Sequence, residues 1–437
     1  MTIDELKKKT IGFISLGCDK NRVDLEKMIT QFRDFGLKFV EDPSHANIIL
    51  INTCSFIQDA KVESIDTIAE MCQYKGKTCE KLIVTGCLSE AHAEELAPEF
   101  PEVDKFVLLK DNKDILKIAG GLYGLKLKPL PETTSRALTT ESHYAYLKIS
   151  DGCNKHCTYC RIPKIRGRYK SEKIEDLVAE ANLLAKKGVK ELILVAQDVT
   201  QYGVDLYGKV MLVELINQLS EIPQIKWIRL LYCYPELITD ELIEVIAKNK
   251  KVCKYLDIPI QHISDDILRH MNRHCTHEQV YQLIEKLRKR VPGITIRSTF
   301  IVGFPGETRA QFKELCRFIK ESKLDNVGFF KYSKEDGTAA TIMQKQIPNF
   351  IKNLRYKKIY KIQEKIMLSK HICLLDSTDD AIIDNVNGEY VTARSSKMAP
   401  IVDPVIYIPV SEKTVIGQIS KIKYIDVTKY DFIGEIL

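Results

Sequence analysis

Short apolar runs alternate with stretches of helical periodicity through the middle of the chain, and this pattern constrains the fold more than any other feature. Such alternation predicts parallel strands joined by helices, because two parallel neighbours need a long crossover between them. The pattern extends from Tyr144 to about Tyr332 and predicts a parallel barrel, or part of one, with its active site at the C-terminal strand ends. The predicted strands are YAYLKIS, ELILVAQ, WIRLLYC, YLDIPI, TIRSTFIVG and NVGFFKY.

The first 125 residues show the same alternation on a smaller scale. Each of three apolar runs is predicted to be a short strand that ends at a cysteine: IGFISLG before Cys18, NIILINT before Cys54 and KLIVTG before Cys87. The segments that follow have helical spacing, so we expect one parallel α/β domain over residues 1–125. Residues 126–143 interrupt the periodicity and are predicted to form a linker.

The last part of the chain has a different pattern. Residues 342–372 are predicted to form a basic helix, and such a run is usually a solvated helix face; its basic residues include Lys352, Arg355, Lys357, Lys358, Lys361 and Lys365. After Cys373 the pattern becomes short and alternating (GEYVTARS, PVIYIPV, TVIGQISKIKYIDV, DFIGEIL), which predicts a small all-β barrel or sandwich. The expected fold class is therefore α/β and multidomain, with a partial (β/α) barrel over residues 144–370 and a small β domain over residues 371–437.

Composition limits the location and the partners. The formal charge of +6, from 65 basic and 59 acidic residues, is too small to indicate a nucleic-acid binder. We find neither an apolar signal core at the start nor a run of eighteen apolar residues, so we expect a cytoplasmic protein without a membrane partner. Thirteen cysteines in a reducing compartment favour metal binding over disulfides.

Three cysteines follow the first predicted strand of the middle domain. In SDGCNKHCTYCRIP, one loop carries Cys153, Cys157 and Cys160. Iron-sulfur clusters usually take four cysteines, so three imply a cluster with one iron open to a small molecule. A zinc site would need a fourth ligand, which His156 could supply only from an awkward position between two of the thiols. Ordinary buried thiols are the remaining alternative.

This triplet, with Tyr159 before its last cysteine, resembles the signature of the radical S-adenosylmethionine (SAM) superfamily. The resemblance implies a 4Fe-4S cluster whose open iron binds SAM, and a deoxyadenosyl radical that abstracts hydrogen atoms where no acid or base could act. It also implies cofactor contacts from LVAQD and STFIVGFPGE, although a Gly-Phe-Pro-Gly stretch is more often a simple turn. The residues in question are Tyr159, Gln197, Asp198, Gly303, Gly306 and Glu307.

Cys18, Cys54 and Cys87 are far apart in the sequence, but each follows a predicted parallel strand. The C-terminal edge of such a sheet collects ligands, so the three thiols are expected to converge and to hold a second cluster. The alternative is that they are buried hydrophobic side chains. The seven other cysteines show no ligand spacing and are interpreted as structural: Cys72, Cys79, Cys233, Cys253, Cys275, Cys316 and Cys373.

The segments SLGCDKNRVDLE, INTCSF and VTGC, followed by the radical triplet, resemble the methylthiotransferase family over nearly the whole chain. The resemblance implies a methylthiotransferase domain, a radical barrel and a C-terminal TRAM domain. It also implies two 4Fe-4S clusters, two uses of SAM, and a reductant such as flavodoxin or ferredoxin. Two positions depart from the family pattern: Asp19, where proline is common, and Leu25, where serine is usual.

Several stretches resemble the branch of this family that modifies an aspartate of small-subunit ribosomal protein S twelve: SLGCDKN, AQDVTQYGVD, YLDIPIQHISDDILRHMNR and VGFFKYSKEDGTAA. The alternative is the branch that modifies a tRNA adenosine, because TRAM domains often bind RNA and the basic helix could contact phosphates. Acids mixed with lysines after Cys373 suit a protein partner at least as well. An iron-sulfur sensor without enzymatic activity would explain the two clusters but not the barrel.

Overall fold

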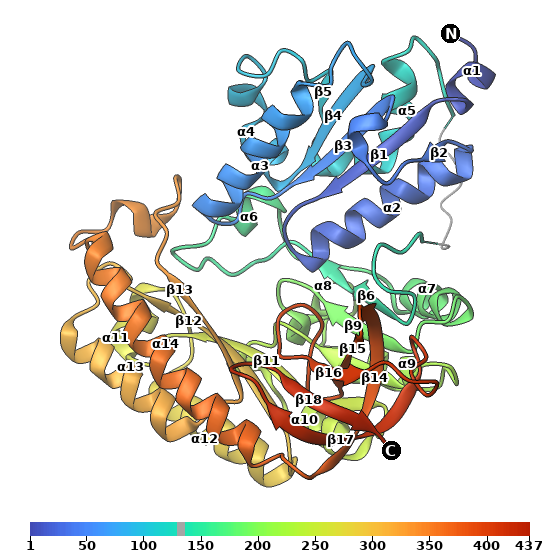
Figure 1. The fold of residues 1–437 in the computed structure, drawn as a ribbon. Coiled ribbons are helices and arrows are strands. Elements are labelled where there is room, and N and C mark those ends of the chain that lie inside the picture. Colours follow the sequence, from blue (N-terminus) through green and yellow to red (C-terminus); the bar gives the residue numbers. More distant parts are fainter. Residues whose placement is uncertain (129–135) are drawn as a thin grey trace.

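The computed structural model describes residues 1–128 and 136–437. Two parallel α/β units and a β-barrel follow one another along the chain, and the barrel lies against the second unit (Figure 1). Part of the predicted linker, residues 129–135, lies outside the described residues. Within the described part of the chain, no helix is long and apolar enough to span a membrane.

The N-terminal unit is a parallel sheet with helices on both faces. Its strand order, among the described residues, is β2-β1-β3-β4-β5. Apolar side chains of α2 and α5 pack on one face, and those of α3 and α4 pack on the other. The elements are α1 (Ile3–Lys7), β1 (Thr10–Ser15), α2 (Asp19–Phe35), β2 (Lys38–Phe39), β3 (Ile48–Thr53), α3 (Gln58–Cys72), β4 (Lys81–Gly86), α4 (Cys87–Leu96), β5 (Lys105–Phe106) and α5 (Ile115–Gly121). The three predicted strands are confirmed as β1, β3 and β4, whereas the two-residue strands β2 and β5 were not predicted.

The second unit is a parallel sheet in which neighbours in space are neighbours in sequence. Its order is β13-β12-β11-β10-β9-β6, so it is an open part of a barrel, and the six predicted strands are confirmed. The strands are β6 (Tyr144–Lys148), β9 (Glu191–Val195), β10 (Trp227–Leu230), β11 (Val252–Gln261), β12 (Thr295–Val302) and β13 (Asn326–Lys331). A small antiparallel pair, β7 (Ser150–Asp151) and β8 (Lys170–Ser171), follows the C-terminal end of β6.

Helices cover one face of this sheet, where the largest core of the protein lies. The helices of this unit are α6 (Ile162–Ile165), α7 (Ile174–Lys186), α8 (Val204–Tyr207), α9 (Leu212–Ser220), α10 (Asp240–Lys248), α11 (Asp265–His270), α12 (His277–Arg290), α13 (Arg309–Ser322) and α14 (Asn349–Ile372). The predicted basic helix is therefore confirmed as α14. Two of its basic residues do not belong to a solvated face, because Lys352 is buried and Arg355 is ion-paired with Glu307.

The other face of the sheet is covered by α2 of the N-terminal unit and by the C-terminal barrel. Its inward side chains, including Tyr146 and Ile193, form a cluster with Val23 of α2 and with Ile382 and Ala399 of the C-terminal barrel. A buried ion network reinforces this contact: Glu191 pairs with Arg229 at 2.7 Å and with Arg394 of the barrel at 2.9 Å. Since Glu191 begins β9, the barrel closes the N-terminal end of the sheet, and the C-terminal end is left to the N-terminal unit (Figure 1).

The C-terminal domain is a closed barrel in the order β14-β15-β16-β18-β17, which confirms the predicted small all-β domain. Its strands are β14 (Thr378–Asn387), β15 (Tyr390–Ser395), β16 (Ile406–Pro409), β17 (Ile419–Val427) and β18 (Phe432–Ile436). β14 was not predicted, because acids interrupt its apolar pattern. One of them, Asp384, is ion-paired with Arg394 and hydrogen-bonded to His143.

His371, in the last turn of α14, packs on Phe432 of the barrel with 4.2 Å between ring centroids. Burial lowers the pKa of His371 to about 4, and the nearby Asp325 only partly opposes this. A histidine in the unfolded chain titrates near 6.5, so between these values the unfolded state binds a proton that the folded state does not. The stability of the folded state therefore decreases as the pH is lowered from 7 towards 4. Linkage gives a loss of about 2 kcal/mol by pH 5.

We therefore expect His371→Leu to remove part of the loss of stability between pH 7 and pH 5. Urea unfolding at both pH values measures it, with His45→Leu, at an exposed position, as the control. An unchanged acid dependence in His371→Leu would contradict this assignment.

Candidate functional site

The loop with Cys153, Cys157 and Cys160 leaves the C-terminal end of β6 and is held tightly by its own backbone. The Cys153 N–H donates to the Gly167 carbonyl at 3.1 Å, and the Cys160 N–H donates to the Cys157 carbonyl at 3.0 Å. Gly152 has a φ of +71°, and a Cβ atom there would lie 2.1 Å from the Arg168 carbonyl oxygen. Glycine is thus required where the loop begins.

Backbone donors face two of these thiols. The N–H of Lys155 donates to Cys153 Sγ at 3.4 Å, and that of Ile162 donates to Cys160 Sγ at 3.5 Å. Burial raises the pKa of Cys153, and it raises that of Cys160 to about 12. These thiols are therefore protonated near neutral pH unless a metal displaces the protons, and the N–H groups are then placed to stabilise the thiolates.

The donors around this loop fit a cluster better than a single ion. His156 is exposed, and no group of three His, Cys, Asp or Glu side chains in the described part of the chain is arranged to hold one metal ion. A zinc ion needs all four ligands within bonding distance of one atom. A cluster binds each thiolate through a different iron and accepts a wider spacing.

Charged side chains of both signs surround the triplet. Lys155 pairs with Glu236 at 2.9 Å and with Asp198 at 3.5 Å, and its Nζ lies 3.8 Å from the ring centre of Tyr234. The guanidinium group of Arg273 also packs on the ring of Tyr234, with 4.1 Å between Arg273 Cζ and the ring centre. Of these residues, only Asp198 was predicted. Lys155 lies within the triplet in sequence, between Cys153 and Cys157, and that position was the one signal available.

Among the described residues, several buried polar atoms of this group have no hydrogen-bond partner, although one of them, Asp198 Oδ2, is the atom that lies 3.5 Å from Lys155 Nζ. These atoms are Gln197 Oε1, Asp198 Oδ2, Glu236 Oε2, Arg273 Nε and Arg273 Nη1. Buried polar atoms are nearly always satisfied, so a cluster of unpaired acceptors and donors indicates that a polar ligand completes them. Burial raises the pKa of Asp198, and Lys155 opposes the shift. The set can bind a ligand that carries both an ammonium and a carboxylate group.

The predicted glycine turn lies beside Tyr159, whose ring is 6.4 Å from that of Phe304. Glu307 accepts from the Gly303 N–H and from Arg355 Nη1, the latter at 2.7 Å, and it lies 3.5 Å from His262. A Cβ atom on Gly303 would come within 2.5 Å of Lys352 Cγ. Gly303 and Glu307 therefore join the turn to α14, whereas Gly306 faces open space.

The structure brings Cys18, Cys54 and Cys87 together at the C-terminal edge of the first sheet. Cys18 is the N-cap of α2, Cys54 follows β3, and Cys87 begins α4. Burial raises the pKa of Cys54 and raises that of Cys87 to about 12, and each of these thiols is also influenced by Cys18. Two helix N-termini at this edge favour thiolates. A Cβ atom on Gly17 would lie 3.0 Å from Cys54 Sγ, so glycine leaves room beside the thiol.

The Cys18 loop contacts the C-terminal end of the second sheet. The Tyr232 hydroxyl donates to Asp19 Oδ2 at 3.0 Å, and Lys20 Nζ lies 3.4 Å from the centre of the Tyr232 ring. Tyr232 has a φ of 61°, which is unusual for a non-glycine residue, and Asp257 accepts its N–H at 3.2 Å. Asp19, which departs from the family pattern, thus joins the two units here.

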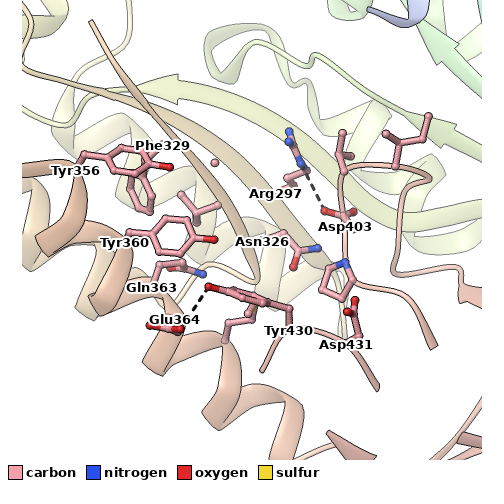
Figure 2. Close-up of a pocket in the computed structure, with 16 residues that line it drawn as sticks. Arg297, Asn326, Phe329, Tyr356, Tyr360, Gln363, Glu364, Asp403, Tyr430 and Asp431 are labelled. Carbon is pink, nitrogen blue, oxygen red and sulfur yellow. Dashed lines mark hydrogen bonds and ion pairs between the residues drawn. The ribbon is translucent and has the colours of Figure 1, made fainter. Parts of the chain in front are cut away.

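A cavity of about 380 Å³ lies elsewhere, between α14, β13 and loops of the barrel (Figure 2). Tyr356, Tyr360 and Tyr430 line it, and Arg297 pairs there with Asp403. Its lining includes the first residues of β13, whereas both cysteine triplets lie at C-terminal strand ends. The cavity is separate from the candidate site.

Comparison with known families divides the chain into three parts. Residues 10–108 match the uncharacterized protein family UPF0004, residues 147–319 match the radical SAM superfamily, and residues 377–437 match the TRAM domain.

Curated relatives are similar over almost the whole chain. The ribosomal protein uS12 methylthiotransferase RimO of Clostridium tetani is 46% identical, over 98% of this chain and 98% of its own. The proteins of the same name from Acetivibrio thermocellus and Clostridium acetobutylicum are 44% and 43% identical, and at least 98% of each chain is covered.

Solved structures share the fold at low identity. The radical SAM methyltransferase TsrM of Kitasatospora setae, with cobalamin and a 4Fe-4S cluster bound, has a TM-score of 0.56 at 12% identity, over 77% of this chain and 74% of its own. The cobalamin-dependent SAM radical enzyme OxsB has a TM-score of 0.52 at 12% identity, over 83% and 57%.

Proposed function

Because this chain belongs to the family of ribosomal protein uS12 methylthiotransferases, which are radical SAM enzymes, we propose that it adds a methylthio group to the β-carbon of an aspartate in that ribosomal protein. The observation that carries the proposal is the position of two cysteine triplets at facing C-terminal sheet edges, joined by the contacts of Tyr232. One triplet suits hydrogen abstraction, and the other suits sulfur delivery.

We propose that Cys153, Cys157 and Cys160 hold a 4Fe-4S cluster that binds SAM, and that Cys18, Cys54 and Cys87 hold a second one. When bound, the first cluster and SAM supply a radical that removes a hydrogen atom from an unactivated carbon. Buried thiols beside backbone donors and helix N-termini support both assignments. We also keep the domain boundaries 1–125, 144–370 and 371–437, since each matched family lies within one of these ranges.

The charged residues beside the first triplet would orient SAM. Lys155 and Arg273 are positively charged and suit its carboxylate, and Asp198 and Glu236 are negatively charged and suit its ammonium group. Asp198, Glu236 and Arg273 also carry buried polar atoms without hydrogen-bond partners among the described residues. Gln197 and Tyr159 complete the wall of this site, and Gly306 leaves space at the turn. The first unit would close this site and keep water away from the reacting groups, and without water the fixed charges act more strongly on SAM.

Reduction of the first cluster requires an electron donor, and we expect a reductant such as flavodoxin or ferredoxin. We also expect a cytoplasmic location. Exposed lysines of α14, such as Lys357 and Lys361, are suited to contact the phosphates of RNA.

The proposal predicts the substrate. With SAM, a sulfur source and a reductant, the reconstituted protein is expected to add one methylthio group to purified uS12, as read by intact mass. A tRNA anticodon stem-loop and a uS12 variant with the target aspartate replaced by alanine serve as controls. Modification of the RNA, with uS12 unchanged, would contradict the proposed substrate.

A further inference from the structure

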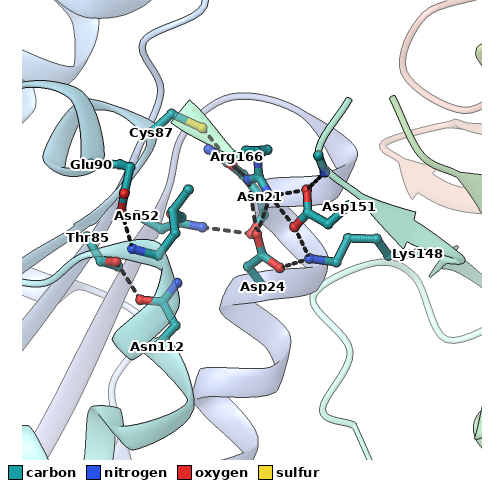
Figure 3. A network of polar contacts seen from close by, with 12 residues as sticks. Asn21, Asp24, Asn52, Thr85, Cys87, Glu90, Asn112, Lys148, Asp151 and Arg166 are labelled. Carbon is teal, nitrogen blue, oxygen red and sulfur yellow. Dashed lines mark hydrogen bonds and ion pairs between the residues drawn. The ribbon is translucent and has the colours of Figure 1, made fainter. Parts of the chain in front are cut away.

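Four charged side chains, of which all but Asp151 are largely buried, form a cluster between the first two units (Figure 3). Arg166, just after α6, donates from Nη1 to Asp24 Oδ2 at 3.0 Å and to Asp151 Oδ2 at 2.8 Å. Lys148, at the end of β6, pairs with the same two carboxylates and lies 2.8 Å from Asp151 Oδ2. The two positive and two negative charges balance, and only 2% of the Arg166 side chain is exposed.

One end of this cluster reaches the auxiliary thiols. Arg166 Nη2 donates to Asn21 Oδ1, and the Cys87 thiol donates to the same oxygen at 3.5 Å. The Asn21 amide donates to the carbonyls of Leu16 and Thr53, at 3.2 and 2.9 Å. Thr53 immediately precedes Cys54, and Leu16 lies two residues before Cys18. Asn21 thus touches the surroundings of all three auxiliary cysteines.

The other end reaches the radical triplet. Asp151 Oδ1 accepts the N–H of Gly152, the residue before Cys153, at 2.8 Å. The same oxygen accepts Gln197 Nε2 at 3.1 Å. Hydrogen bonds therefore run without a break from the auxiliary edge, through Asn21, Arg166 and Asp151, to the loop of Cys153.

We propose that Arg166 is a positioning residue that holds the auxiliary cysteines in a fixed relation to the radical triplet, so that sulfur transfer is coupled to SAM cleavage. The inference rests on the proposed function. A planar guanidinium can bond Asn21 and Asp24 on one unit and Asp151 on the other at once, whereas the ammonium group of lysine has no such fork. Reacting groups lose much of their rate advantage when their relative position is loosened by an ångström.

A purely cohesive role is the competing explanation, and the chain offers a matched control for it. Lys61 of α3 pairs with Glu335, which follows β13, and this pair also joins the first two units. This pair is also largely buried, with 11% of the Lys61 side chain and 3% of the Glu335 side chain exposed. Within the described part of the chain, Lys61 and Glu335 form no hydrogen bond or ion pair with the six cluster cysteines. Lys61→Met therefore loosens the same interface without breaking the connection between the triplets.

The test compares Arg166→Met, Arg166→Lys and Lys61→Met in the reconstituted full-length protein with uS12. In both Arg166 variants we expect 5′-deoxyadenosine formation within about twofold of wild type and methylthio product lower by about tenfold or more. The ratio of the two products therefore rises in these variants and stays at the wild-type value in Lys61→Met. In all three the iron content stays at the wild-type value. Amide hydrogen exchange of residues 17–21 is expected to be faster in Arg166→Met than in Lys61→Met.

A proportional loss of both products in the Arg166 variants, or an equal rise of the ratio in Lys61→Met, would overturn the inference. If Arg166→Met does not fold, Arg166→Lys, which keeps the charge, decides it. Failure of wild type to modify uS12 would instead contradict the proposed substrate. Hydrogen exchange then still tests whether Arg166 fixes the Cys18 loop, and unchanged exchange in Arg166→Met would overturn the inference.

Discussion

The Cys157→Ala variant is expected to form no 5′-deoxyadenosine and no methylthio product above background. The three thiols of this loop leave no spare ligand, so removing one releases the cluster on which SAM cleavage depends. Chromatography of the nucleoside and the intact mass of uS12 measure the two products. Iron analysis is expected to show the loss of one cluster, with the other retained in the first unit.

Cys316→Ala is the matched control for this result. Cys316 of α13 and Cys157 are both 7% exposed, so the control removes an equally buried thiol from a position without ligand spacing. We expect Cys316→Ala to keep both activities. Formation of 5′-deoxyadenosine by Cys157→Ala would show that the catalytic cluster lies elsewhere.

The Cys54→Ala variant is expected to separate the two halves of the reaction. It should still cleave SAM, because Cys54 belongs to the other sheet edge, but it should transfer no methylthio group, because the auxiliary cluster has lost a ligand. The same two product assays read this directly, and the iron content is expected to fall by one cluster.

Cys79→Ala controls for the loss of a buried thiol in the same unit, since Cys79 packs in the apolar core against the sheet. We expect it to retain methylthio transfer. Full transfer by Cys54→Ala would contradict a role of the auxiliary triplet in sulfur delivery, whatever the fate of SAM cleavage.

The longer strands of both sheets could be predicted because their apolar runs are continuous and mostly buried, whereas the two-residue strands β2 and β5 carry no such run. β3, for example, is apolar from Ile48 to Ile51 and buried throughout. β14 could not, because Asp379, Asp380 and Asp384 interrupt its apolar pattern. Asp384 pairs with Arg394 and is hydrogen-bonded to His143, which lies in the linker far from it in sequence, and no local pattern reports such a contact.

The two triplets could be predicted for a similar reason: parallel strands place their C-terminal ends at one edge, so cysteines after β1, β3 and β4 had to come together. The charged residues around the first triplet could not be predicted in this way. Glu236 and Arg273 come from separate loops after β10 and β11, and nothing in their own sequence marks them. Arg166 is also unmarked, because its role depends on Asp24 of another unit.

The most direct test of the account is the intact mass of uS12 from cells that lack this gene and carry wild type, Cys54→Ala or no copy on a plasmid, measured together with tRNA nucleosides. The account predicts a methylthio increment on uS12 with wild type alone, and unchanged tRNA in all three strains. An unmodified uS12 with wild type present, or a methylthio-adenosine in tRNA that appears only with wild type, would contradict it.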